Sequence, residues 1–265
     1  MRVTTFLYSR PSQWGGVFGR WAAGWWRMLL LGAIALVLAC SPSTYTRAHR
    51  IATARQIHRS AWQVLPWFAA LSALVALVII RIVLVTALSY GLSRFALEMV
   101  VRVLVLELIP LSAALFVALR AGLAFNPAEL DVPAIDPGEP EAAPWQRRRD
   151  LVAEVTGNAF AVLTLALVSS VLVLLLAYLN VYGLSPWGLA DYTRTVGRVF
   201  EPTVSIGFAL KTVMFGLAVA VIPAAAILER QRFGTGARAT MQPGAVRLLF
   251  VLLMIEAASL AVKYF

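Results

Sequence analysis

The sequence predicts an all-α polytopic membrane protein, with an interfacial amphipathic helix near the N-terminus and about five transmembrane helices. Hydrophobic residues make up 60% of its 265 residues and charged residues only 14%, a balance that excludes an ordinary soluble domain. Several windows of about 20 apolar residues follow one another, and each is long enough to cross a bilayer as a helix. The longest polar connection, at residues 120–150, lies between the second and third spans.

The N-terminal segment, residues 1–60, precedes a membrane domain expected at 61–265. Large apolar residues recur in this segment at spacings of three and four, which favours an amphipathic helix in the headgroup layer: Trp14, Phe18, Trp21, Trp25 and Leu29. The apolar run that follows is too short to cross alone, although an extra span over 21–40 is an open alternative. A lipoprotein cleavage site before Cys40 is another, but the arginines after it resist export.

The first two spans are expected at about 64–90 and 92–119. The short break at Tyr90-Gly91 makes the two helices antiparallel neighbours. Arg81 lies inside the first span, and a charged side chain at such a position usually faces protein or a wet cavity rather than lipid.

The second span carries several charges. Arg94, Glu98 and Arg102 follow one another at steps of four, which predicts a self-neutralising ladder along one helix face. Glu107 lies about 220° around the helix from Arg94 and therefore points away from this ladder. An ionisable group at membrane depth is expensive, so Glu107 is the more interesting charge.

The end of the second span leads into the polar insert. Pro110 follows Glu107 by three residues, Arg120 follows an apolar run, and the helix is expected to break at Gly122. Asn126, Pro127 and Glu129 then have the pattern of a capped helix start. Prolines are dense across the rest of 120–150, which argues against a long helix there. The insert is either a solvated linker or a docking surface for a soluble partner.

Three more spans are expected at about 153–180, 204–228 and 244–263. The connection at 181–200 is rich in aromatic residues, as in an interface belt. Lys211 lies near the beginning of the fourth span, and Glu256 interrupts the last one.

The basic residues bear on orientation and on partners. The chain has 23 basic and 13 acidic residues, but they cluster at span ends, where lipid headgroups and topology explain them, so no nucleic-acid partner is expected. The connections 120–150 and 229–247 each contain four arginines and 181–200 contains two, which predicts a cytoplasmic N-terminus and a periplasmic C-terminus. The chain has one cysteine, and its two histidines, His49 and His58, lie in an arginine-rich segment without a nearby third ligand, so no metal site is expected.

The order of motifs resembles that of MlaE-type permeases, also called YrbE-type, the membrane subunits of MCE-associated ABC lipid transporters. The family motif E-L-G-P, an apolar run, G-R-x-G and A-E is similar to Glu107–Pro110, Leu119–Gly122 and Ala128–Glu129. The family's K-S-x-x-F-G resembles Lys211–Gly216. The chain departs from the pattern where Leu119 replaces a glycine and where the insert becomes proline-rich.

The resemblance implies a permease that moves phospholipid or a related lipid between the bacterial inner membrane and a periplasmic MCE-domain protein. It implies a dimer with a second copy or a paralogue, and a separate ABC ATPase subunit. The chain has no Walker-type phosphate-binding motif, so ATP is expected to bind the partner, and the chain itself is expected to hold no cofactor and no catalytic residue.

The resemblance and the residues together assign three groups of candidates. The residues expected to couple to the ATPase are Asn126, Pro127, Glu129 and Asp131. The candidates for lipid contact, or for ion pairing, are Tyr90, Arg94, Glu98, Glu107 and Lys211. The residues expected to keep the family's structure are Pro110, Arg120, Gly122, Phe215 and Gly216.

Two other classes stay open at this point. A non-transporting scaffold subunit of an envelope complex would use its arginines only for topology. An integral-membrane enzyme would need polar side chains to converge at one depth, and five could do so: Glu98, Glu107, Glu154, Asn158 and Lys211.

Overall fold

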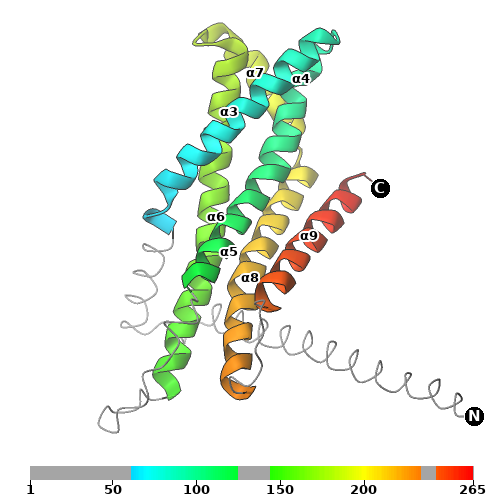
Figure 1. Ribbon diagram of the computed structural model, residues 1–265. Coiled ribbons are helices and arrows are strands. Elements are labelled where there is room, and N and C mark those ends of the chain that lie inside the picture. Colours follow the sequence, from blue (N-terminus) through cyan, green and yellow to red (C-terminus); the bar gives the residue numbers. More distant parts are fainter. Residues whose placement is uncertain (1–60, 125–143, 234–242, 265) are drawn as a thin grey trace, which may run out of the picture.

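The computed structural model describes residues 61–124, 144–233 and 243–264, and within these ranges the chain is helical without a strand (Figure 1). Five helices are long and apolar enough to cross a membrane: Leu65–Ser89, Phe95–Arg120, Val155–Tyr182, Pro202–Ala225 and Ala245–Lys263. The prediction of an all-α polytopic membrane protein is therefore confirmed. The expected amphipathic N-terminal helix, Cys40 and both histidines lie outside the described residues.

Helix α3 (Leu65–Ser89) forms the first span. Pro66 lies in its first turn, where the missing N–H has no intrahelical acceptor in any case. The helix ends at a tight turn in which Gly91 has a φ of 69°, a left-handed conformation that glycine adopts without a steric penalty. This turn reverses the chain between the first and second spans, as expected from the break at Tyr90-Gly91.

The second span consists of three helical segments. Helix α4 (Ser93–Val100) continues into a π-helix, η3 (Val101–Leu108), and then into α5 (Ile109–Ala124). The span expected at about 92–119 is present, but it is not a uniform α-helix, and Pro110 supplies the physical reason. In an α-helix its ring would clash with the carbonyl of Leu106, and its nitrogen has no hydrogen to donate to that carbonyl. The wider π turn relieves this clash, and π segments are frequent at functional sites.

The boundaries of the polar insert also differ from the prediction. Helix α5 passes through Gly122 to Ala124, so the expected break at Gly122 is wrong. A glycine inside a helix costs only about 1 kcal/mol, which tertiary packing offsets. Helix α6 (Pro144–Tyr182) begins at Pro144, where proline is favoured in the first turn, and takes up the end of the insert. Residues 125–143, and with them the expected coupling residues, lie outside the described residues.

Helix α6 is the centre of the bundle, because it packs against α3, α5 and α8 (Figure 1). After it, the connection expected as an aromatic belt contains a short 3-10 helix, η4 (Pro186–Gly188), and an amphipathic helix, α7 (Leu189–Val199). Asp191 in the first turn of α7 and Arg198 in its last turn complement the helix dipole. The sequence analysis missed α7 because it is too polar for a span.

Three tyrosines fasten α7 to the end of α6. The Tyr192 ring lies edge-on to that of Tyr178, with centroids 5.1 Å apart, and next to Tyr182 at 6.3 Å. The Tyr192 hydroxyl donates a hydrogen bond to the Leu174 carbonyl at 2.7 Å. Burial raises the pKa of Tyr192 to about 12, so this phenol remains protonated and can donate throughout the ordinary pH range.

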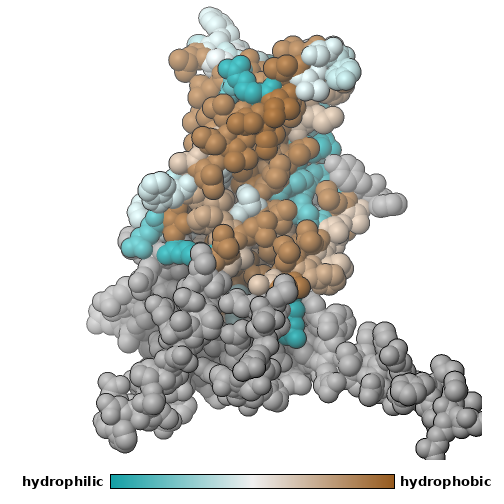
Figure 2. All heavy atoms as spheres, in the orientation of Figure 1, coloured by the Kyte–Doolittle hydropathy of each residue, from teal (hydrophilic) through white to brown (hydrophobic). Residues whose placement is uncertain are grey.

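Helices α8 (Pro202–Phe233) and α9 (Pro243–Tyr264) complete the bundle and pack against each other. The last span is present as expected, and α9 is continuous through Glu256, the charge that interrupts its apolar run. Helix α9 ends beside the middle of the second span, short of the α3–α4 turn (Figure 1). Figure 2 shows that apolar side chains cover most of the described flank, as expected of a surface that faces lipid.

Candidate functional site

Four charged side chains meet in the middle of the bundle, and we call them the ion cluster: Glu107 from η3, Lys211 from α8, and Glu256 and Lys263 from α9. The Lys211 ammonium is an ion-pair partner of Glu107 Oε2 and lies 2.8 Å from Glu256 Oε2. Lys263 Nζ lies 2.8 Å from Glu107 Oε1. The side chain of Lys211 is only 3% exposed. Two formal positive and two formal negative charges therefore balance inside the bundle.

The π segment determines how Glu107 and Lys211 meet. Besides its carboxylate partners, Lys211 Nζ donates a hydrogen bond to the Leu106 carbonyl at 3.5 Å. This is the carbonyl that an N–H at position 110 would serve in an α-helix, and Pro110 has none. The lysine therefore adds a side-chain donor to a backbone carbonyl of the second span. Glu107 and the Leu106 carbonyl, on adjacent residues, are thus both partners of the same cation.

Packing between α8 and α6 holds Lys211 in place. One turn after it, Phe215 is fully buried, and its ring centroid lies 5.8 Å from Lys211 Nζ. Gly216 lies so close to α6 that a Cβ added there would be 3.0 Å from the Ala159 carbonyl oxygen. The two helices approach through small residues, as is common in membranes. Phe215 and Gly216 thus both lie where α8 packs tightly in the bundle.

The ion cluster joins two predicted candidates and adds two that sequence reasoning missed. Glu107 and Lys211 were expected to contact lipid or to form an ion pair, and the structure shows the pair. Glu256 was interpreted as an interruption and Lys263 was not considered. A signal for both existed, because a lone charge inside an apolar span needs an opposite charge from another helix. Glu256 Oε2 is paired with Lys211 by distance, although the angle is not that of a hydrogen bond.

Glu98 lies apart from this cluster. It forms an ion pair with Arg102 at 2.9 Å, one step of the predicted ladder, while the side chain of Arg94 is outside the described part of the chain. Of the polar groups that an integral-membrane enzyme would bring together, Glu98 therefore lies apart from Glu107 and Lys211. In the described ranges no group of three or more His, Cys, Asp or Glu side chains could hold a metal ion.

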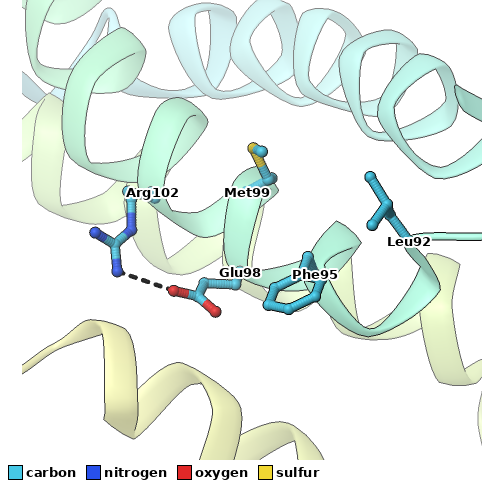
Figure 3. A pocket seen from close by; sticks show the side chains of 5 residues that line it. All are labelled: Leu92, Phe95, Glu98, Met99 and Arg102. Atoms are coloured by element: carbon cyan, nitrogen blue, oxygen red, sulfur yellow. Dashed lines mark hydrogen bonds and ion pairs between the residues drawn. The ribbon is translucent and has the colours of Figure 1, made fainter. Parts of the chain in front are cut away.

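The Glu98–Arg102 pair borders an open hollow on the outside of α4 and η3. This hollow has a volume of about 330 Å³ and is lined by Leu92, Phe95, Glu98, Met99 and Arg102. Figure 3 shows Arg102 and Glu98 side by side at one end, Met99 next to Glu98, and Phe95 and Leu92 toward the other end. Tyr90, the remaining candidate, is 76% exposed beside the α3–α4 turn and does not line the hollow.

Among comparisons with known proteins, a family model described as permease MlaE matches residues 53–130 and 148–262, more than half of the chain. These ranges contain all five residues that line the hollow and three of the four residues of the ion cluster; Lys263 follows directly after them. No curated protein and no solved structure matches the chain.

Proposed function

Because the chain belongs to the MlaE permease family, we propose that it moves phospholipid or a related lipid between the bacterial inner membrane and a periplasmic MCE-domain protein. The family is one of membrane permeases of ABC lipid transporters. The observation that carries the proposal is the family match on both sides of the insert, together with five spans in the described residues.

The ion cluster and the charged pair at the hollow have different proposed roles. The ion cluster is balanced in charge and largely buried, so it holds the second, fourth and fifth spans together instead of offering a free cation. The hollow lies just beyond it along the same π segment, and the Arg102 side chain there is 39% exposed. Apolar lining suits acyl chains, and one accessible cation at the border suits a headgroup phosphate.

Filling the hollow tests this assignment. Met99→Trp is expected to reduce ATP-dependent transfer of phospholipid out of proteoliposomes about tenfold, because the larger ring occupies space that the acyl chains need. Leu253→Trp is the matched control, since Leu253 is a similarly exposed apolar residue on α9, away from the hollow. Equal transfer by the two variants would remove the hollow from the lipid path.

Energy for transport is proposed to enter through a separate ABC ATPase, and the chain itself is proposed to bind no cofactor. The contact is assigned to the insert, with Asn126, Pro127, Glu129 and Asp131 at its centre. The support is chemical: the insert joins the second span, which carries Glu107, to the third, and it is the longest polar connection in the sequence.

Replacing residues 126–141 with a Gly/Ser linker is expected to abolish copurification of the ATPase with the permease while leaving the permease in the membrane. A flexible linker keeps the connection but removes the sequence pattern of a capped helix start and the acidic side chains. Affinity purification from membranes that contain both subunits measures the effect. An ATPase that still copurifies in full would contradict the coupling role and favour the non-transporting scaffold.

The orientation and assembly complete the proposal. The N-terminus is proposed to lie in the cytoplasm and the C-terminus in the periplasm of the inner membrane, and the arginine-rich connections support this orientation. The permease is proposed to work as a dimer, with a second copy or a paralogue, and to hand lipid to an MCE-domain partner. Mass spectrometry of lipid that copurifies with the complex identifies the substrate.

A further inference from the structure

The first span carries one charge on its outer side. Arg81 is the only charged residue of α3. The stripe that packs into the bundle consists of Phe68, Ser72, Ala76 and Ile80. At 3.6 residues per turn, Arg81 lies about 100° or more around the helix from each of these residues. Arg81 is exposed and therefore points away from the other described helices, not into the protein interior where the sequence pattern predicted it.

The surroundings of Arg81 are apolar. Five aliphatic residues share its side of α3 and are between 44% and 65% exposed: Leu74, Leu77, Val78, Val85 and Leu88. Within the described residues no ion pair or hydrogen bond involves the Arg81 guanidinium. An unpaired guanidinium on a lipid-facing helix is costly, since arginine near a helix centre opposes membrane insertion by about 3 kcal/mol. The described residues therefore leave Arg81 in need of an anion.

The depth of Arg81 identifies where that anion comes from. It lies eight residues before Ser89, or about 12 Å along the helix from the α3–α4 end. A helix of 25 residues is about 37 Å long, whereas the hydrocarbon core is about 30 Å thick. The Cα of Arg81 thus lies within the hydrocarbon, but its long side chain can extend toward the headgroup layer of the nearer leaflet. Phosphate groups are the anions present in that layer.

We propose that Arg81 binds the phosphate of a membrane phospholipid whose acyl chains lie along the exposed apolar side of α3. The planar guanidinium can donate two parallel hydrogen bonds to phosphate oxygens. The aliphatic residues on either side of Arg81 supply the surface that the chains cover. The site is on α3 and shares no lining residue with the hollow on α4 and η3, so it does not depend on the transport function.

The test uses the full-length protein in lipid nanodiscs of phosphatidylcholine with a small, varied fraction of phosphatidylglycerol. Native mass spectrometry then counts the phosphatidylglycerol molecules that remain bound. Arg81→Gln is expected to lose one tightly held phosphatidylglycerol and to weaken its apparent binding about tenfold. Arg81→Lys should retain part of the binding, because it keeps the charge without the planar donor pair. Arg198→Gln, an exposed arginine in the last turn of α7, is the matched control and should retain all of it.

Three outcomes would overturn the proposal. Arg81→Gln could retain as much phosphatidylglycerol as the unsubstituted protein. It could leave lipid retention unchanged while converting a purified dimer into monomers, which would identify a carboxylate of a second copy as the partner. Displacement of the lipid by millimolar inorganic phosphate would show that the site takes free phosphate instead. Circular dichroism and gel filtration confirm folding, which Gln at this outward position should preserve.

Discussion

Lys211→Ala is expected to lower the free energy of unfolding by about 3–5 kcal/mol, the typical cost of removing one partner from a buried ion pair. The substitution removes the ammonium that lies 2.8 Å from Glu256 and that also pairs with Glu107. It also removes the lysine's hydrogen bond to the Leu106 carbonyl. Denaturant unfolding of the purified protein in detergent measures the change, and transport by the variant should be lost as well.

A double variant separates lost pairing from lost packing. Adding Glu256→Gln to Lys211→Ala removes one of the carboxylates that the lysine leaves behind. The double variant should therefore lose about 1–3 kcal/mol less unfolding free energy than the sum of the losses of the two single variants. Arg102→Ala is the control, because the Glu98–Arg102 pair is partly exposed and should contribute about 1 kcal/mol or less. If Lys211→Ala were no more destabilising than Arg102→Ala, the ion cluster would not hold the spans together.

Gly216→Leu is expected to have the second large effect, a loss of about 3 kcal/mol or more of stability together with displacement of α8 from α6. A Cβ added at this position would lie 3.0 Å from the Ala159 carbonyl oxygen, and this backbone atom cannot move aside as a flexible side chain can. Adding extra methylenes to a tightly packed interior typically costs about 1–3 kcal/mol, and occasionally more. Gly216→Ala should have a smaller effect of the same sign.

A glycine in the same helix provides the control. A Cβ at Gly207 would meet no atom within 4 Å, so Gly207→Ala should change stability by less than about 1 kcal/mol and in the stabilising direction. Thermal unfolding in detergent compares the variants. Equal behaviour of Gly216→Ala and Gly207→Ala would mean that α6 and α8 do not approach closely at Gly216. Because Lys211 is one turn and a half before Gly216, displacement of α8 should also disturb the ion cluster.

Lys211 and Gly216 lie on the same helix, α8, and together fix its contacts with the second span and with α6. Lys211 donates a hydrogen bond to the Leu106 carbonyl of the second span, and Gly216 lets α8 come close to α6. In the proposed transporter, these contacts keep a fixed relation between the insert, which would meet the ATPase, and the hollow, which would meet lipid. The hollow and the proline are in the same continuous span, so movement at one end would reach the other.

The sequence predicted correctly those features that depend on a single helix or on neighbouring residues. The five spans follow from runs of apolar residues, because a bilayer accepts only segments with satisfied backbone groups and apolar side chains. The tight turn at Gly91 and the Glu98–Arg102 step follow from neighbours in the chain. The amphipathic helix α7 escaped this reasoning, since its stability depends on the tyrosines of α6 against which it packs.

The sequence by itself determined the membrane class, the number of spans and the family to which the chain belongs. Tertiary structure alone decided which charges are partners, because Glu107, Lys211, Glu256 and Lys263 come from three separate segments whose mutual rotation no local pattern encodes. It likewise decided that Arg81 points outward. The physical reason is the same in both cases: burial and pairing depend on which face of a helix its neighbours cover, and neighbours are chosen by packing between distant parts of the chain.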